Sequence, residues 1–280
     1  MKIIQTVSGL DDALQVFRRE GRTIGFVPTM GALHQGHAAL VNQCVSENDR
    51  CVVSIFVNPT QFNNADDLHH YPRTLEQDQA LLESIGTDIV FAPTVEEMYP
   101  EPDRRVFHFG VLDTVMEGQY RPGHFNGVAQ VVSKLLTIVE PDRAYFGEKD
   151  FQQLAIVREM VQQLQLPVEI VAVPIVREAS GLAMSSRNQR LSEEQKKSAA
   201  KIYRILRESI LLAGESTPQH ITDFVIGEIN KVPGLLVEYF EIVDGHSLQL
   251  ISSWQHSGYI VGCIAVFCGD VRLIDNIRYK

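Results

Sequence analysis

The sequence predicts an α/β fold, with a Rossmann-like parallel-sheet domain followed by a smaller α+β domain. Residues 24–29, 51–57 and 88–92 are short apolar runs rich in β-branched and aromatic side chains, a pattern typical of buried strands. Each run leads into a Pro-Thr pair, and these pairs are spaced by about one βαβ unit of roughly 30 residues. Helix-like stretches at residues 38–48 and 74–85 lie between the runs. Such alternation indicates parallel strands joined by right-handed crossovers.

The same alternation continues toward the middle of the chain. We expect helices at residues 127–139 and 151–164, and strands at residues 143–146 and 168–175. In open α/β sheets, ligands bind at the carboxyl ends of the strands. The loops expected to carry chemistry are therefore those after Val27, Val57, Phe146 and Ile175.

The character of the sequence changes in its last third. A long charged helix is predicted at residues 193–212, opened by a capping box, Ser192-x-x-Gln195. A second helix at residues 217–231 and two strands at residues 235–243 and 259–268 follow, with a turn near residues 244–246. We therefore predict two domains, residues 1–178 for nucleotide and substrate binding and residues 179–280 as a lid.

Composition limits the class of protein. The chain has 280 residues, of which 45% are hydrophobic and 21% charged, as in globular proteins. Its net charge of −10 argues against a nucleic-acid partner, so a phosphate site must be built locally from a few cations, backbone N–H groups or a metal. The four cysteines lack zinc-site spacing and are expected to be buried. With no signal peptide or long apolar run, we expect a cytoplasmic protein that does not enter the membrane.

The strongest motif is Thr-Met-Gly-Ala-Leu-His-Gln-Gly-His at residues 29–37, between a predicted strand and a predicted helix. Its glycines allow close backbone approach, and a helix N-terminus offers N–H groups to phosphate. Two histidines, His34 and His37, can donate hydrogen bonds to phosphate oxygens. The spacing alone fits a metal pair or an ordinary turn equally well. The strand-to-helix context favours a nucleotide site.

A second motif, Ala-Met-Ser-Ser-Arg-Asn at residues 183–188, offers hydroxyls and a guanidinium that could hold a triphosphate on a mobile loop. Alone it would be an ordinary polar linker. Together the two motifs resemble the HIGH and KMSKS-like motifs of the nucleotidyltransferase superfamily and the class I aminoacyl-tRNA synthetases. In that superfamily the histidines bind ATP phosphates.

Three further motifs narrow the resemblance. They are Phe-Val-Asn-Pro-Thr-Gln-Phe at 56–62, Arg-Pro-Gly-His-Phe-Asn-Gly-Val at 121–128 and Phe-Gly-Glu-Lys-Asp-Phe-Gln-Gln at 146–153. In this order, over essentially the whole chain, they resemble the pantoate–β-alanine ligase family. The resemblance implies ATP-dependent condensation of pantoate with β-alanine through a pantoyl adenylate, with release of AMP and pyrophosphate. It also implies Mg²⁺ and a homodimer.

The resemblance assigns roles residue by residue. The catalytic candidates are His37, His34, Lys149 and Arg187, with His37 the first choice as proton donor or phosphate stabiliser. The ATP-binding candidates are Met30, Gly31, Ala32, Leu33, His34, Gln35, Gly36, His37, Gly147, Glu148, Lys149, Asp150, Val176, Met184, Ser185, Ser186 and Arg187. Val176 is expected to contact adenine through its main chain. Asp150 either caps the helix that follows or lies near Mg²⁺.

Amide side chains form the expected second substrate site. Asn58, Gln61 and Gln153 can orient a hydroxy acid without quenching its nucleophilicity. The resemblance places Gln61 and Gln153 on pantoate, with Gln61 also near β-alanine. Asn58 fits equally well as a residue that shapes the Asn-Pro turn.

Several features stay open at this point. The roles of Tyr71, Arg121 and His124 are not assigned, and residues 66–71 are more typical of a solvated loop than of a metal cluster. One rival function is an adenylyl- or cytidylyltransferase, which should have extra Arg or Lys beside the histidine motif to hold a phosphate acceptor. Another is a non-catalytic nucleotide sensor, which the combination of two histidines with Lys149 and Arg187 disfavours.

Overall fold

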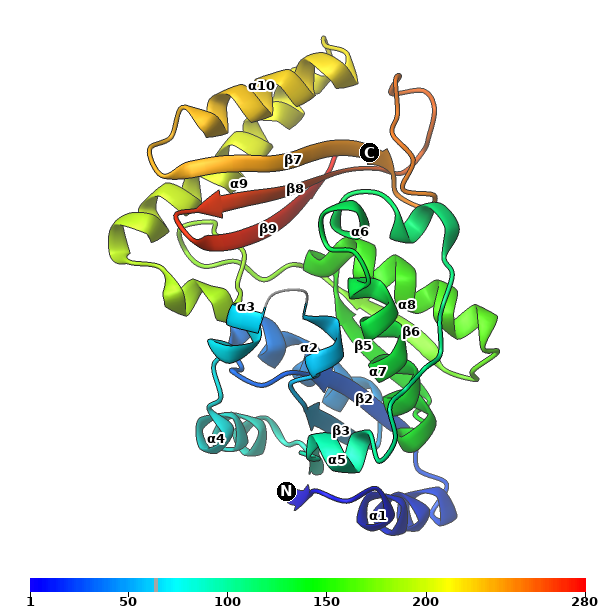
Figure 1. The fold of residues 1–280 in the computed structure, drawn as a ribbon. Helices are drawn as coiled ribbons and strands as arrows, with labels where there is room; N and C mark the ends of the chain where they lie inside the picture. The colour runs from blue at the N-terminus through cyan, green and yellow to red at the C-terminus, as the bar shows by residue number, and fades with distance from the viewer. Residues whose placement is uncertain (63–64) are drawn as a thin grey trace. The chain divides into compact units, whose positions relative to one another are not determined.

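A computed structural model describes residues 1–62 and 65–280, which form two compact units. The first unit comprises Met1–Phe109, Arg121–Glu148 and Gln153–Pro174. The second comprises Gly110–Tyr120, Lys149–Gln152 and Ile175–Lys280. The second unit therefore takes two short segments from earlier in the chain, in addition to its last third (Figure 1).

The first unit is built on a parallel sheet. Its strand order is β1-β4-β3-β2-β5-β6 and every pairing is parallel, which confirms the predicted Rossmann-like class. Because β3, β2 and β5 are adjacent and parallel, their carboxyl ends lie at the same edge of the sheet. The strands are β1 (Lys2–Ile4), β2 (Ile24–Thr29), β3 (Arg50–Ile55), β4 (Ile89–Phe91), β5 (Arg143–Gly147) and β6 (Glu169–Val173).

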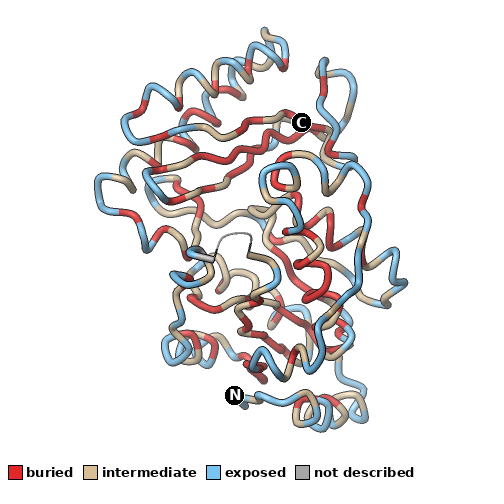
Figure 2. The backbone as a smooth tube through the Cα atoms, in the orientation of Figure 1, coloured by how far each residue is buried: buried red, intermediate tan, exposed pale blue. Residues whose placement is uncertain are grey.

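Helices cover this sheet, and its core is apolar. Consecutive residues of β2 and β3 are buried, which requires cover on both faces of the sheet (Figure 2). On one face, Val27, Val53 and Val90 pack with Val41 of α2 and Leu82 of α4. The helices whose residues lie wholly or mostly in the first unit are α1 (Val7–Arg19), α2 (Gln35–Glu47), α3 (Ala65–His69), α4 (Leu75–Ile85), α5 (Val95–Met98), α7 (His124–Val139) and α8 (Phe151–Gln163).

The structure corrects the sequence-based reading in several places. The polar stretch at residues 66–71, expected to be a solvated loop, overlaps the helix α3 (Ala65–His69), and Tyr71 is buried with its ring 5.7 Å from that of Phe62. Helices α2 and α7 each begin three residues earlier than predicted, inside the motifs themselves. Strand β1 and helix α1 were not predicted.

Among the described residues, no group of three or more His, Cys, Asp or Glu side chains is placed to hold a metal ion.

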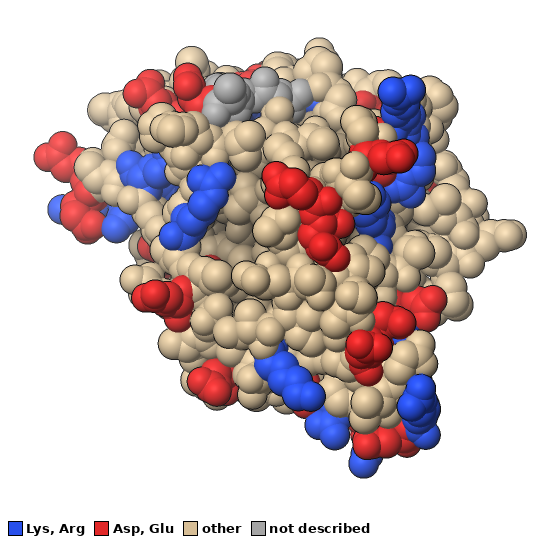
Figure 3. Space-filling model, turned by 60° about the horizontal axis from the view of Figure 1, so that its bottom comes forward, with Lys and Arg blue, Asp and Glu red and all other residues tan. Residues whose placement is uncertain are grey.

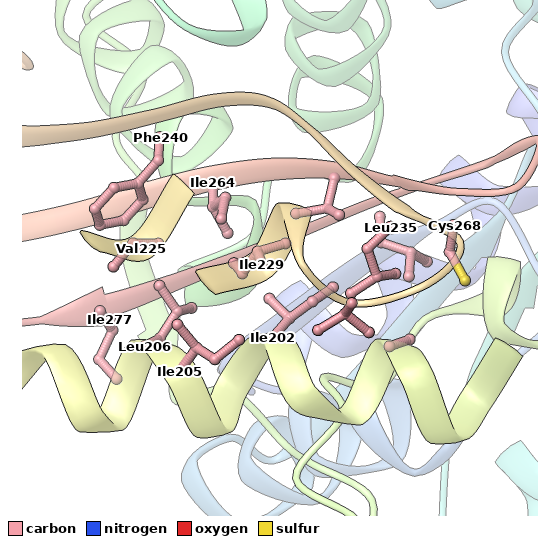
Figure 4. Packing of buried hydrophobic residues seen from close by; sticks show 14 of the residues in the cluster. Ile202, Ile205, Leu206, Val225, Ile229, Leu235, Phe240, Ile264, Cys268 and Ile277 are labelled. Carbon is pink, nitrogen blue, oxygen red and sulfur yellow. The ribbon is translucent and has the colours of Figure 1, made fainter. Parts of the chain in front are cut away.

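The second unit contains an antiparallel sheet of order β7-β8-β9. Its strands are β7 (Leu235–Asp244), β8 (Ile260–Cys268) and β9 (Val271–Arg278), and its helices are α6 (Glu117–Tyr120), α9 (Glu193–Ala213) and α10 (Pro218–Asn230). Figure 4 shows Ile202, Ile205 and Leu206 of α9 pointing toward Val225 and Ile229 of α10. The predicted capping box is confirmed, because the backbone N–H groups of its two residues each donate to the other's side chain. Strand β9 was not predicted, since buried polar residues interrupt its apolar pattern.

Charges of both signs are interspersed on the face drawn in Figure 3. All four cysteines are free and buried, as expected from their spacing. In the described part of the chain, no helix combines the length and apolarity that crossing a membrane requires.

The turn after β7 predicts a pH-dependent contribution to stability. Partial burial disfavours ionised Asp244, but hydrogen bonds from Ser257, Ser247 and the His246 N–H outweigh it and lower the pKa to about 2. A depressed folded-state pKa stabilises the protein above the unfolded value of 3.8, and this stability is lost as the pH falls toward 2. After allowance for solvent screening, we expect Asp244→Asn to reduce the change in the free energy of unfolding between pH 5 and pH 2 by about 1 kcal/mol. Urea unfolding at several pH values between 2 and 5 measures it, with Asp270→Asn as the control; parallel curves for Asp244→Asn and the unmodified protein would contradict it.

Candidate active site

The histidine motif lies at the carboxyl end of β2, where the chain turns into α2. Gly31 and Ala32 both have left-handed backbone conformations, with φ of 82° and 49°. The Gly31 N–H donates to Thr29 Oγ1 at 3.2 Å, and Thr29 Oγ1 donates to the carbonyl of Ser54 on β3 at 2.7 Å. The loop is therefore tied to the neighbouring strand before it reaches the histidines.

The two histidines cap the helix that follows them. His34 is the N-cap of α2, and its Nδ1 accepts the Gly36 N–H at 3.1 Å. His37 Nδ1 accepts the His34 N–H at 3.3 Å, so the pair forms a capping box from imidazoles where Ser or Thr with Glu or Gln is usual. The two ring centroids are 4.1 Å apart. A nitrogen that accepts a hydrogen bond carries no proton, so each neutral ring has its proton on Nε2 and acts there as a donor.

The loop after β3 is organised around Asn58, whose side chain is almost fully buried. Its Nδ2 donates to Gly127 O at 3.2 Å and to Gln61 Oε1 at 3.3 Å. Its Oδ1 accepts from the Tyr99 hydroxyl at 2.9 Å and from both the N–H and the hydroxyl of Thr60. Burial raises the pKa of Tyr99, which keeps that hydroxyl a donor. These contacts support the turn-shaping role for Asn58 that the sequence left open.

Gln61 connects this loop to the histidine motif. Its Nε2 contacts Met30 Sδ at 3.2 Å, so the structure brings together residues from the ends of β2 and β3. The backbone carbonyl of Gln61 accepts from His124 Nδ1 at 2.9 Å, while His124 Nε2 is 3.1 Å from Arg121 Nη1. Because the guanidinium can only donate, His124 carries its own proton on Nδ1. The sequence left Arg121 and His124 unassigned. In the structure His124 holds the backbone of Gln61, and Arg121 holds His124.

Gly127 explains part of the Arg-Pro-Gly-His-Phe-Asn-Gly-Val motif. A Cβ at Gly127 would lie 2.4 Å from the backbone carbonyl oxygen of Thr60 and 2.8 Å from Gln61 Cα. No side chain fits between α7 and the Gln61 loop at this point. The glycine is therefore required for the close approach of the helix to the loop, and not for chain flexibility.

The segment after β5 is divided between the two units. Gly147 and Glu148 belong to the first unit, and so does Gln153, which is half-buried in the first turn of α8. Lys149 and Asp150 group with the second unit, where Lys149 Nζ is 3.6 Å from Asp150 Oδ2 and the Lys149 carbonyl accepts from Asn276 Nδ2 at 3.1 Å.

The remaining predicted residues lie on one hairpin of the second unit or directly after it. The Met184 N–H donates to the Val176 carbonyl at 3.0 Å, and Arg177 forms an antiparallel bridge with Ala183. Ser185 caps the short 3-10 helix η4 (Ser186–Arg190), accepting the Arg187 N–H at 3.2 Å. The hairpin therefore brings Val176 next to Met184, with Ser185, Ser186 and Arg187 directly after it.

Sequence reasoning missed the residues that hold these loops in place. In the second unit, Arg177 makes a bidentate ion pair with buried Asp275 at 2.7 and 2.9 Å and stacks on the ring of Tyr203. In the first unit, Asp78 of α4 binds the histidine loop, which is the segment Met30–Leu33 between β2 and the N-cap His34. Asp78 had a signal in the sequence, because it shares the apolar face of its predicted helix with Leu82, four residues on. Arg177 had no comparable local signal.

Comparison with known proteins gives a consistent result. The family described as pantoate-beta-alanine ligase matches residues 2–278. The chain is 60% identical to a pantothenate synthetase from Bacteroides fragilis, covering 100% of this chain and 99% of that protein. It is 58% identical to one from Porphyromonas gingivalis over the full length of both.

Solved structures agree in fold over the whole chain. A crystal structure of pantothenate synthetase from Thermus thermophilus superposes with a TM-score of 0.94 at 46% identity, covering 100% of both chains. A pantoate-beta-alanine ligase from Francisella tularensis, complexed with beta-gamma ATP and beta-alanine, gives a TM-score of 0.84 at 36% identity, covering 100% of this chain and 98% of that one. The chain belongs to the pantoate–β-alanine ligase family.

Proposed function

We propose that the protein condenses pantoate with β-alanine at the expense of ATP, through a pantoyl adenylate, releasing AMP and pyrophosphate. The observation that carries the proposal is the histidine motif at the end of β2. Two imidazoles with fixed tautomers lie in the first turn of α2, and an amide side chain, Gln61, contacts Met30 of the same motif. Family membership and the ATP and β-alanine complex of the Francisella relative support the choice of substrates.

In the first step, a carboxylate oxygen of pantoate attacks the α-phosphorus of ATP and pyrophosphate leaves. No covalent enzyme intermediate is needed, so the protein contributes position and electrostatic stabilisation. The Nε2–H groups of His34 and His37 donate to phosphate oxygens as negative charge develops on them. The N-terminus of α2 adds a favourable dipole for the same anion.

Other residues of the nucleotide site are proposed from family resemblance. Gly147 fits a place in the nucleotide site. A Cβ built there would meet no other part of the protein within 4 Å, so the space beside this backbone is open to a ligand. We assign binding of phosphate oxygens to Lys149, Ser186 and Arg187, and a main-chain adenine contact to Val176. The Val176 carbonyl accepts the Met184 N–H, so a hairpin hydrogen bond holds the main chain that we assign to the adenine contact.

The acceptor site is proposed to use amides. Gln61 and Gln153 orient pantoate through hydrogen bonds that do not protonate or neutralise its carboxylate. Asn58 acts one step away, since its side chain is occupied with Gln61, Gly127 and Tyr99. In the second step, the amine of β-alanine attacks the acyl carbonyl of the adenylate, the C–O bond to AMP breaks, and the amine loses a proton.

For Mg²⁺, the proposed nucleotide site offers one protein carboxylate, that of Asp150. The Asp150 side chain is 45% exposed and offers one carboxylate, and among the described residues no cluster of three such ligands exists. Mg²⁺ is commonly held by one or two carboxylates together with substrate phosphates and water. We propose Asp150 as its protein ligand; a bound ion would neutralise phosphate charge. The homodimer implied by the family resemblance stays a prediction.

Pyrophosphate release tests the proposed function. With ATP and pantoate but no β-alanine, we expect a burst of about one pyrophosphate per active site and then little turnover, because the adenylate stays bound. Adding β-alanine should start continuous release of pyrophosphate and AMP. Pyrophosphate release that does not depend on pantoate, or an α-phosphate label that stays on the final product in place of AMP, would count against the proposal.

Two matched glutamine variants locate the acceptor site. Gln153 and Gln163 lie on the same helix, α8, and Gln163 binds the His108 carbonyl and Glu159. Gln153→Ala should raise the KM for pantoate by about tenfold, the loss of one or two substrate hydrogen bonds. Gln163→Ala should leave it unchanged, and equal effects of the two would remove Gln153 from the site.

A further inference from the structure

Asp78 is a buried carboxylate of α4 that binds the histidine loop directly. Its Oδ2 accepts the Ala32 N–H at 2.9 Å, and its Oδ1 accepts the Leu33 N–H at 2.8 Å. The Thr74 hydroxyl donates a third hydrogen bond, to Oδ1, at 3.2 Å. Asp78 is only 2% exposed. A buried carboxylate is tolerated when its oxygens are bonded in this way, and these donors come mainly from the loop.

The loop has a backbone that needs such a partner. Gly31 and Ala32 are both left-handed, a conformation that is unfavourable for alanine and persists only when the surroundings impose it. Successive N–H groups in turns of this kind form a concavity that binds anions. Here the anion is the carboxylate of Asp78. A Cβ on Gly31 would lie 3.0 Å from Asp78 Oδ2, so the glycine is also needed for the close approach.

The two bonds from Asp78 act on the residues immediately before His34. Thr29 and Ser54 fix the start of the loop, and Asp78 fixes its end at Leu33. The next residue, His34, is the N-cap of α2 and hydrogen bonds to His37. Asp78 therefore holds the two residues that immediately precede the N-cap of α2.

We propose that Asp78 is a positioning residue for nucleotidyl transfer, acting through the Ala32 and Leu33 N–H groups and not through contact with ATP. The inference rests on the proposed function, because the rate it controls is that of adenylation. A position error of about 1 Å in groups that bind a reacting centre can cost roughly 100-fold in rate. A residue with only a structural role would lower stability without selecting one half-reaction.

Asp78→Asn is the test. The amide keeps the size of the side chain but turns one acceptor into a donor, so one of the two loop N–H groups faces a second donor. We expect the rate of pantoate-dependent pyrophosphate release at saturating ATP to fall about 10- to 100-fold. The reaction of preformed pantoyl adenylate with β-alanine should fall less than about threefold, since no phosphate is transferred in that step.

Asp142→Asn is the matched control. Asp142 Oδ2 accepts the N–H of Ile24, the first residue of β2, at 2.7 Å. It therefore caps the same strand at its other end, away from the histidine loop. Asp142 is exposed and an asparagine oxygen can still accept the Ile24 N–H, so we expect a small shift in the urea midpoint and an adenylation rate close to that of the unmodified protein. Equal rate losses in the two variants would overturn the proposal, and so would an Asp78→Asn variant with a normal adenylation rate.

A milder variant keeps the test valid if Asp78→Asn does not fold. Thr74→Val removes only the third hydrogen bond to Asp78, and Thr74 makes no side-chain cap with α4. We expect adenylation to slow by about 2- to 10-fold, with the β-alanine step unchanged. Unchanged adenylation in Thr74→Val would then count against Asp78. Failure of the proposed function is distinct, because the unmodified protein itself would show no pantoate-dependent pyrophosphate release.

Discussion

His37→Gln should reduce the rate of pantoyl adenylate formation by about 100- to 1,000-fold while leaving α2 intact. Loss of one donor to the charge that develops in a transition state costs about this much. Glutamine is a usual residue at the third position of a capping box, so its side chain can accept the His34 N–H as His37 Nδ1 does. The substitution therefore removes the imidazole and keeps the cap. The measurement is pyrophosphate release at saturating ATP and pantoate, with urea unfolding as the check on stability.

Two comparisons separate chemistry from capping. His37→Ala loses both the imidazole and the cap, so it should show the same rate loss plus about 1 kcal/mol of stability. His220 occupies the corresponding third position of α10, after the N-cap Thr217. His220→Gln should change neither rate nor stability by a measurable amount. A His37→Gln variant with at least a third of the normal adenylation rate would exclude His37 from the chemistry.

Arg272→Met should lower the free energy of unfolding by about 3–5 kcal/mol, the usual cost of breaking a buried ion pair. Arg272 makes a bidentate pair with Glu117 at 2.7 and 2.8 Å and also binds Glu238. The Tyr239 hydroxyl donates to the same Glu117 oxygen as Arg272 Nη2, at 2.8 Å. The exposed fraction of each of the three charged side chains is 20% or less. Without the guanidinium, two carboxylates would face each other with little water. Burial opposes the charge on Arg272, but its hydrogen bonds to Glu117 and Glu238 raise its pKa overall.

The control for this network lies on the same strand. Arg278→Met changes an exposed arginine of β9 whose Nε donates to the carbonyl of Lys280, and we expect less than about 1 kcal/mol. Combining Arg272→Met with Glu117→Gln and Glu238→Gln should recover part of the loss, since it removes the uncompensated charges. Urea unfolding of the four proteins gives the values. A loss below about 1 kcal/mol for Arg272→Met alone would show that the network contributes little.

The network also shows why two early segments of the second unit, Gly110–Tyr120 and Lys149–Gln152, could not be assigned to it from sequence. Glu117 lies in the short helix α6, and its N–H donates to Gln152 at the start of α8. Both segments group with residues 175–280 through side chains that are far apart in sequence. No composition change marks them, because short segments carry no periodicity of their own.

The class of the fold and the strand-to-helix turn that carries His34 and His37 could be predicted from the sequence alone. Apolar runs such as β2 and β3 reflect burial on both faces, and the turn from β2 into the His34 cap has a recognisable local pattern. These features depend on residues that are close together in the chain, so the sequence itself shows them. The choice of pantoate and β-alanine came from resemblance across the chain, and spacing alone would not have provided it.

The contacts that hold the site in place depend on the tertiary structure. Asp78 reaches Leu33 across 45 residues, and His124 reaches the Gln61 carbonyl across 63. The order of strands in the sheet and the packing of α4 and α7 determine which distant donors and acceptors meet. A buried polar side chain such as that of Asp78 breaks the apolar pattern of its helix. The sequence does not show its hydrogen-bonding partner, because the fold brings that partner from a distant part of the chain.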